Sequence, residues 1–176
     1  MKRILYFLGA LFLFMSCNQE VVNKNEVREY VDLGLSVKWG DRNMGANAPE
    51  VFGDFYAWGE TVTKDEYTKK NCLTYGLEID VISGDSQYDV ARKEWGGTWR
   101  LPTNYEMTEL VTNCIFKRSI INNVVGYFAI GPNGNRIFLP ASGYYLGSKY
   151  YYKKFFGGKF PVGRENGVHH VPVRVF

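Results

Sequence analysis

A chain of 176 residues is long enough for one domain with a sizeable hydrophobic core but short for two. Its formal net charge is only +3 and it has no run of basic residues, so nucleic acid is not an expected partner. Aromatic residues make up 16% of the chain and glycines number 19, which favours strands and turns over a helical bundle.

The N-terminus has the features of a bacterial export signal. Lys2 and Arg3 precede an apolar run, Ile4–Met15, that is shorter than the roughly 20 residues needed to span a membrane. The run ends at Ser16 and Cys17, which resembles the lipobox at which bacterial lipoproteins are cleaved and lipidated. We therefore expect lipidation of Cys17. The alternative is an ordinary cleaved signal that contains a cysteine by chance.

This signal divides the chain into three expected parts. Residues 1–16 are a lipoprotein signal peptide, residues 17–26 a polar tether, and residues 27–176 a single folded domain. The expected partner is then a membrane, contacted through the lipid anchor. The expected location is the cell envelope, with the anchor in the outer membrane.

Strand patterns dominate the first part of that domain. The segment 28–46 has two apolar runs around Gly34, which predicts two strands joined by a turn. The segment 52–60 predicts a third, short aromatic strand between Gly53 and Gly59. The range 61–83 shows no clean period and is expected to be a loop.

Two cysteines remain after Cys17. Cys72 and Cys114 could pair as a disulfide, because an exported protein folds in an oxidising compartment. The alternative is two separate buried thiols. Neither cysteine has a neighbouring histidine, so a zinc site is not expected.

The first predicted helix covers Ser86–Trp95. Asp85 or Ser86 can cap its N-terminus, and its apolar residues share one face at helical spacing. The pair Gly96 and Gly97 is expected to end it.

A second helix is predicted directly after Pro102. Thr103 and Glu106 form the T-x-x-E pattern of a capping box, in which each side chain binds the other residue's backbone N–H. The residues that follow recur at helical spacing as one buried stripe: Met107, Leu110, Val111 and Cys114.

The second half of the chain returns to strands. Two apolar runs flank the turn sequence Gly-Pro-Asn-Gly at 131–134, which predicts a hairpin. The segment 169–176 predicts a final strand, and Pro172 restricts that strand to a sheet edge. The order of strands, two helices and strands predicts an α+β domain with mainly antiparallel sheets.

Four segments together are similar to a known family. The sequences EYVDLGLSVKWGDRNMGA, GDFYAWGE, WGGTWRLPTNYEMTEL and GPNGNRIFLPASGY, in this order over residues 29–145, resemble the Fibrobacter succinogenes major paralogous domain family. That family is common among exported lipoproteins of Bacteroidetes. The resemblance implies a C-type lectin-like fold in which the N- and C-terminal strands are adjacent.

The Trp-Arg-Leu-Pro-Thr segment, 99–103, is then expected to support the fold rather than to perform chemistry. In this interpretation Trp95 and Trp99 are core aromatic residues around the Gly-Gly turn, and Pro102 and Thr103 set the start of the second helix. Arg100 needs a carboxylate partner if it is buried, because an unpaired buried charge is costly. Glu60 is the candidate, and the alternative is an exposed Arg100.

No pattern in the sequence indicates an enzyme. His169 and His170 are neighbours, and neighbouring strand residues face opposite sides, so they are not expected to hold one metal ion. Nucleophile elbows and phosphate-binding glycine patterns are absent from the sequence. The calcium-dependent sugar motifs of lectins are absent as well. We therefore expect no catalytic residues, no metal and no cofactor.

An aromatic segment near the C-terminus is the best candidate for a binding surface. Tyrosine offers wide contact at low entropic cost, and sugars stack on aromatic faces. We expect a surface or periplasm-facing module that binds a glycan or a protein. The alternatives are that half of these aromatic residues fill the core, and that the domain is a structural or assembly component of the envelope without its own ligand. The candidate residues are Tyr144, Tyr145, Tyr150, Tyr151, Tyr152 and Phe155.

Overall fold

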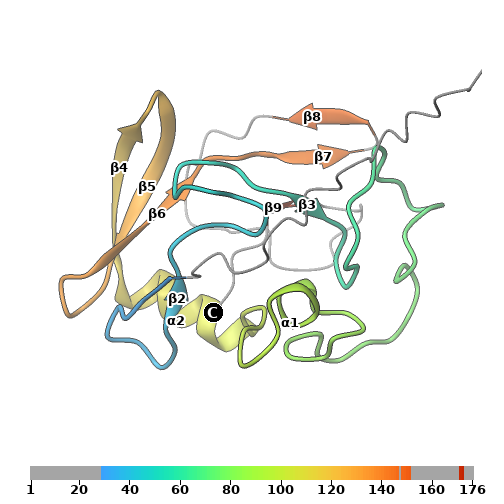
Figure 1. Cartoon of the computed structure of the whole chain (residues 1–176), viewed down its shortest axis with the longest axis horizontal. Helices are drawn as coiled ribbons and strands as arrows, with labels where there is room; N and C mark the ends of the chain where they lie inside the picture. The colour runs from blue at the N-terminus through green and yellow to red at the C-terminus, as the bar shows by residue number, and fades with distance from the viewer. Residues whose placement is uncertain (1–28, 147, 152–170, 173–176) are drawn as a thin grey trace, which may run out of the picture.

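The computed structural model describes residues 29–146, 148–151 and 171–172. In this part of the chain, two helices and nine short strands form a mixed α+β arrangement (Figure 1), and all the sheets are antiparallel. The predicted fold class is therefore confirmed at the level of α+β with antiparallel sheets and two helices.

The first two strands form a small ribbon. Strand β1 (Tyr30–Val31) pairs with β2 (Trp39–Gly40), as the sequence predicts. The connection turns at Gly34, whose φ of 74° is easily adopted only without a side chain, and whose N–H donates to Asp32 Oδ1 at 2.8 Å.

The last described strand pairs with the aromatic strand in the middle of the sequence. Strand β3 (Phe55–Tyr56) is antiparallel to β9 (Val171–Pro172), so a short third strand and a final strand both form. The implied adjacency of the first and last strands is not found in the described residues, because β1 pairs with β2 and β9 pairs with β3. The intervening range 61–83 contains no helix or strand, as predicted.

The first helix is shorter than the sequence predicts. Helix α1 (Val90–Trp95) begins after Asp89, which is its N-cap, so the predicted start at Ser86 and the predicted cap at Asp85 or Ser86 are wrong. The Asp89 carboxylate accepts from Arg92 N in the first turn of the helix and from Gly84 N and Leu101 N outside it, which fixes the helix start at this residue. The glycine stop is confirmed, since Gly96 is the C-cap with a φ of 68°.

The second helix forms where the capping box places it. Helix α2 (Asn104–Asn113) has Thr103 as N-cap, and both hydrogen bonds of the box with Glu106 are present. Leu110 and Cys114 are buried and Met107 packs against them, while Val111 is half-buried.

A three-stranded sheet follows the second helix. Its strands are β4 (Ile115–Ile121), β5 (Val124–Ile130) and β6 (Arg136–Pro140), in that spatial order. The β5–β6 hairpin around residues 131–134 is confirmed. Strand β4 was not predicted, although the two positive φ angles of Asn122 and Asn123, 46° and 64°, mark a two-residue hairpin turn.

A last hairpin joins β7 (Tyr144–Leu146) to β8 (Lys149–Tyr151). In Figure 1 it lies along the same side of the molecule as the upper part of the β4–β5 hairpin, away from the two helices. The helices lie together on the opposite side, below β3 in that view, with β2 drawn at the level of α2.

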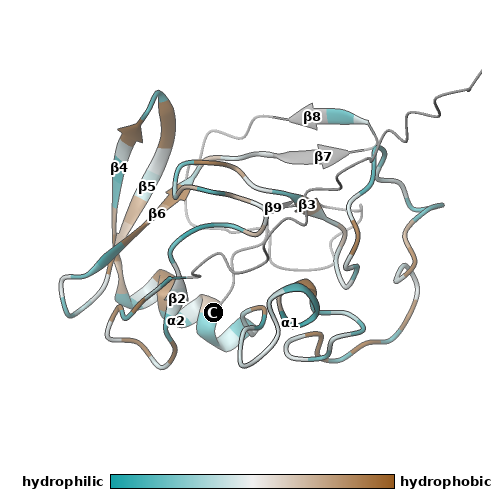
Figure 2. Cartoon of the chain, in the orientation of Figure 1, coloured by the Kyte–Doolittle hydropathy of each residue, from teal (hydrophilic) through white to brown (hydrophobic). Residues whose placement is uncertain are grey.

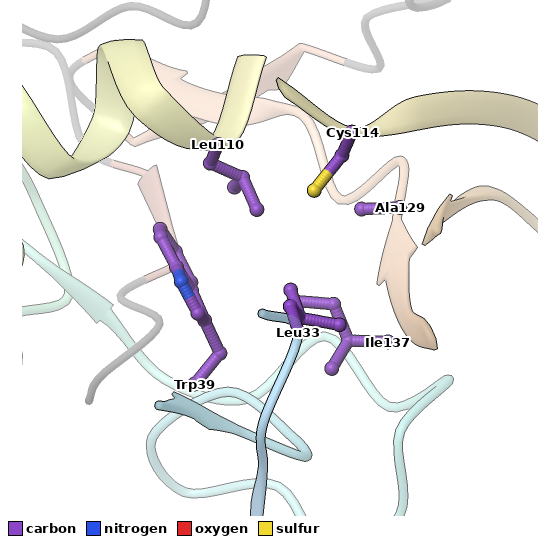
Figure 3. Close-up of a cluster of buried hydrophobic side chains, with 6 residues drawn as sticks. All are labelled: Leu33, Trp39, Leu110, Cys114, Ala129 and Ile137. Atoms are coloured by element: carbon purple, nitrogen blue, oxygen red, sulfur yellow. The ribbon is translucent and has the colours of Figure 1, made fainter. Parts of the chain in front are cut away.

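The main core lies between the β1–β2 ribbon, α2 and the three-stranded sheet. Figure 3 shows its six side chains converging from these elements: Leu33, Trp39, Leu110, Cys114, Ala129 and Ile137. We call this set the first core cluster. Gly131 allows the ribbon to approach the sheet, because a Cβ there would lie 2.0 Å from the carbonyl oxygen of Leu33. Close backbone contact of this kind requires glycine.

A second core cluster lies under α1. Its buried members are Met44, Tyr56, Val90, Ala91 and Leu101, with Ile82, Trp95 and Trp99 packed against them. This cluster connects the aromatic strand β3 to the segment that carries the Trp-Arg-Leu-Pro-Thr sequence.

Candidate functional site

The carboxylate of Asp89 is the most deeply buried charged group among the described residues, with 0% of the residue exposed. It accepts three backbone hydrogen bonds, from Gly84 N at 2.6 Å, Leu101 N at 2.8 Å and Arg92 N at 3.0 Å. Three donors of this kind stabilise a buried carboxylate strongly. Asp89 thus ties the end of the long loop, the first turn of α1 and the segment before α2 to one point.

Arg100 binds Glu106 rather than the predicted partner Glu60. Its two terminal nitrogens lie 2.9 Å and 2.5 Å from the two carboxylate oxygens, a bidentate ion pair. Glu106 also accepts from the backbone N–H and the hydroxyl of Thr103, both at 2.8 Å. The capping box holds Glu106 in place, and Arg100 lies near enough to reach it.

These contacts set the charge states of the pair. Hydrogen bonding from Arg100 lowers the pKa of Glu106 from 4.5 to about 2, and the hydrogen bonds from Thr103 act in the same direction. The hydrogen bond to Glu106 in turn raises the pKa of Arg100. Both groups are charged at neutral pH, so neither is poised to exchange a proton with a substrate.

Glu60 has a different role from the predicted one. Its carboxylate lies 2.5 Å from Lys64 Nζ and accepts a hydrogen bond from the backbone N–H of Leu73 at 2.8 Å. The residue is 5% exposed, so it is buried as expected for a structural group. It stabilises the long loop 61–83 rather than the start of α2.

The two tryptophans of the motif contact each other. The ring centroids of Trp95 and Trp99 lie 5.0 Å apart with an interplanar angle of 85°, a favourable edge-to-face geometry. Both side chains pack against the second core cluster. With Asp89, Arg100 and Glu106 already engaged, the Trp-Arg-Leu-Pro-Thr segment has the contacts of a structural support.

Two further groups that could act as a base or a nucleophile are protonated at neutral pH. Burial and the neighbouring Asp54 raise the pKa of Tyr56, whose hydroxyl donates to Asp54 Oδ2 at 3.4 Å. Burial raises the pKa of the Cys114 thiol, which disfavours the reactive thiolate.

The two cysteines of the domain are free thiols in different places. Cys114 belongs to the first core cluster, whereas Cys72 is in the loop 61–83 with its sulfur 3.5 Å from Thr74 Oγ1. The disulfide that the sequence left open is therefore not formed. Among the described residues, no group of three or more His, Cys, Asp or Glu side chains could hold a metal ion. His169 and His170 lie outside the described residues.

Four of the six predicted binding residues come together in the β7–β8 hairpin. The register places Tyr144 opposite Tyr151 and Tyr145 opposite Tyr150, while Lys149 beside them is exposed. Residues 152 and 155, the other two candidates, lie outside the described part of the chain. We call this hairpin the tyrosine hairpin.

A second exposed surface was missed by sequence reasoning. Half of the ten exposed large hydrophobic residues in the described chain lie between residues 62 and 81. They are Val62, Leu73, Tyr75, Leu77 and Val81, and Leu73 is 79% exposed. A short alternation of apolar and acidic residues at 77–81 is the signal that could have indicated it, but five residues are too few to establish a period.

The described helices are both too short and too polar to cross a lipid bilayer. Comparison of the chain with protein-family models, with curated proteins and with solved structures found no match. The described residues therefore define an α+β arrangement with antiparallel sheets, and the function is inferred from its surfaces.

Proposed function

We propose that this protein is a non-enzymatic lipoprotein of the cell envelope that binds a glycan or a protein through the tyrosine hairpin. In this proposal the domain has a C-type lectin-like fold, residues 1–16 are removed, and Cys17 carries the lipid at the outer membrane. The motifs that resemble the major paralogous domain family support the fold and the location.

The pairing of four tyrosines in one hairpin is the observation that carries this function. Tyr144 stands opposite Tyr151 and Tyr145 opposite Tyr150 across two short strands, so tyrosines that are separate in sequence form two cross-strand pairs, one on each face of the hairpin. Tyrosines at such density suit recognition of sugar rings or of apolar protein surfaces. Exposed Lys149 adds a positive charge beside them.

The arrangement of the rest of the domain supports a binding role. Residues 94–110 form the motif most suggestive of an active site. In this motif the N–H of Leu101 donates to Asp89, and Arg100 forms an ion pair with Glu106. The polar groups of the motif are therefore engaged within the fold, which leaves the tyrosine hairpin as the candidate recognition surface.

Replacing both Tyr150 and Tyr151 by serine is expected to abolish binding to the partner and leave the fold intact. The measurements are a glycan array and a pull-down from envelope extracts, each with the chain carrying Cys17→Ala for solubility. The matched control is Tyr105→Ser, because Tyr105 is 75% exposed on α2 and lies outside the hairpin. Equal binding by the double variant, or no captured glycan or protein with folded wild type, would instead favour a structural role.

The anchor has its own test. Cys17→Ala is expected to move the protein from the membrane fraction to the soluble envelope fraction and to remove the lipid mass from the mature chain. Fractionation and intact-mass measurement check both, with Cys72→Ala as the control, because Cys72 lies in the folded domain. A Cys17→Ala protein that remains in the membrane fraction would contradict lipid anchoring.

A further inference from the structure

Strand β4 is an exposed edge of the three-stranded sheet. Among the described residues it pairs with β5 on one side only, and Figure 1 shows it at the outer margin of the drawn strands. The two-residue turn at 122–123 makes Ile121 and Val124 the closing hydrogen-bonded pair. Hydrogen-bonded and non-hydrogen-bonded pairs alternate along the strands, so the backbone N–H and C=O groups of Arg118 and Ile120 point away from β5.

The exposed side chains of β4 follow a definite pattern. Lys117 and Arg118 are exposed cations at its centre, and Ile120 is 56% exposed. Because strand residues alternate between faces, Phe116, Arg118 and Ile120 share one face and Lys117 shares the other with Ser119. Phe116 packs against the first core cluster, so its face continues the apolar interior.

The segment Leu77–Val81 has the complementary pattern. Its sequence, Leu-Glu-Ile-Asp-Val, alternates apolar and acidic residues, and all but the central Ile79 are exposed. Within the described chain, no hydrogen bond or ion pair is found for residues 78–81. This apolar and acidic alternation is typical of a strand with one face buried, yet the segment belongs to a loop in the single chain.

We propose that β4 of one copy of this protein binds the segment Leu77–Val81 of a second copy as an added antiparallel strand. With Asp80 opposite Lys117, the register places Glu78 opposite Ser119 and Ile79 opposite Arg118. The apolar residues of the segment then extend the Phe116 face. Addition of a strand to an exposed edge is a common mode of recognition, in which backbone hydrogen bonds provide affinity and side chains provide register.

Charge favours this pairing over the symmetric one. Two copies of β4 paired with each other about their centres would place Arg118 opposite Arg118, and like charges directly opposite are destabilising. Pairing with the acidic segment replaces that repulsion by the attraction of Lys117 and Asp80. The acidic loop of a second copy is thus the better occupant of the edge.

The positions of the two surfaces determine the kind of assembly. Loop 61–83 and β4 lie at opposite ends of the molecule in Figure 1, so they do not pair within one copy. Figure 2 shows hydrophobic residues at the end of β4 and along the loop. A contact between two different surfaces is heterologous and leaves a free surface at each end, so it produces head-to-tail chains of copies. The tyrosine hairpin takes no part in this contact and remains available for its own partner.

Disulfide trapping tests the register directly. Full-length chains carrying Cys72→Ser and either Asp80→Cys or Lys117→Cys are purified in detergent, mixed and mildly oxidised. Asp80 and Lys117 form a non-hydrogen-bonded pair, whose Cα separation of about 4.5 Å suits a disulfide. We expect a mixed cross-linked dimer at least tenfold faster than with the matched control Arg118→Cys, which faces the opposite side of β4.

A charge swap tests the same contact without new cysteines. In sedimentation of the full chain, Lys117→Glu or Asp80→Lys alone is expected to weaken self-association about threefold to tenfold, and the double variant is expected to restore it. All positions changed are exposed, so circular dichroism should show unchanged folding. Mixed cross-linking no faster than the Arg118→Cys control, Lys117→Cys copies that cross-link equally fast to each other, or failed rescue by the double variant would overturn the proposal.

Discussion

Replacing Asp89 with alanine is expected to lower the free energy of unfolding by about 3–5 kcal/mol, an exceptionally large loss for one polar side chain. The change leaves three buried backbone N–H groups, of Gly84, Arg92 and Leu101, without their acceptor. Each unsatisfied buried donor costs roughly 1–3 kcal/mol, and loss of the N-cap of α1 is one of these costs. Urea denaturation at pH 7 measures the difference.

The control for this prediction is Asp85→Ala. Asp85 is exposed, and within the described part of the chain its carboxylate accepts a single, local hydrogen bond, from Gln87 N at 2.9 Å. Its loss should therefore cost about 0.5 kcal/mol or less. A cost for Asp89→Ala no larger than that for Asp85→Ala would contradict the role of Asp89 as the cap of α1 and as the acceptor that connects the three segments.

The second large effect concerns Glu106 and depends on pH. Glu106→Gln is expected to destabilise the domain by about 2–3 kcal/mol at pH 7, because Arg100 loses its ion-pair partner while the amide can still cap the helix. The 7% exposure of Glu106 keeps this interaction from being screened away by solvent. Glu66→Gln, at an exposed position in the loop, is the matched control.

The pH dependence follows from the lowered pKa of Glu106. Its folded-state pKa is about 2, below the ordinary value of 4.5, so between these pH values the unfolded chain binds more protons at this site. The stability that this carboxylate contributes is complete above pH 4.5 and is lost as the pH falls towards 2. Stability of wild type should therefore drop more steeply over that window than stability of Glu106→Gln. Parallel curves would contradict the assignment.

The sequence correctly predicted the helix ends and turns that depend only on residues close to one another in the chain. The capping box of Thr103 and Glu106, the Gly96 stop and the turn at 131–134 each depend on residues within a few positions, and each forms as predicted. The short aromatic strand and the final strand also form where their patterns indicated.

The errors concern partners that are chosen by packing. Arg100 could have paired with any nearby carboxylate, and only the assembled fold shows that Glu106 is within reach and that Glu60 binds Lys64 instead. Asp89 replaces the predicted cap because Leu101, a distant residue in sequence, also donates to it. Strand β4 was missed because it begins directly after α2 without a turn signal and carries exposed apolar residues at the sheet edge.

For the candidate binding site too, the sequence shows one part and the structure decides the other. The sequence shows a high density of tyrosines after residue 143, but which tyrosine stands opposite which is decided by the register of β7 and β8. The exposed segment Leu77–Val81 carries too short an alternation to be recognised alone. Only the fold shows that Leu77 and Val81 are exposed and that, among the described residues, one edge of β4 has no partner strand.

By itself, the sequence determined the α+β class, the start of α2 and the hairpin around residues 131–134. It also predicts the export signal. These depend on composition, periodicity and short-range hydrogen bonds, which operate within a few residues of chain. Only the tertiary structure decided the partners of Arg100 and Asp89, the free state of Cys72 and Cys114 and the exposed edge of β4. Those outcomes depend on which distant groups burial brings within hydrogen-bonding distance, and no local pattern encodes that choice.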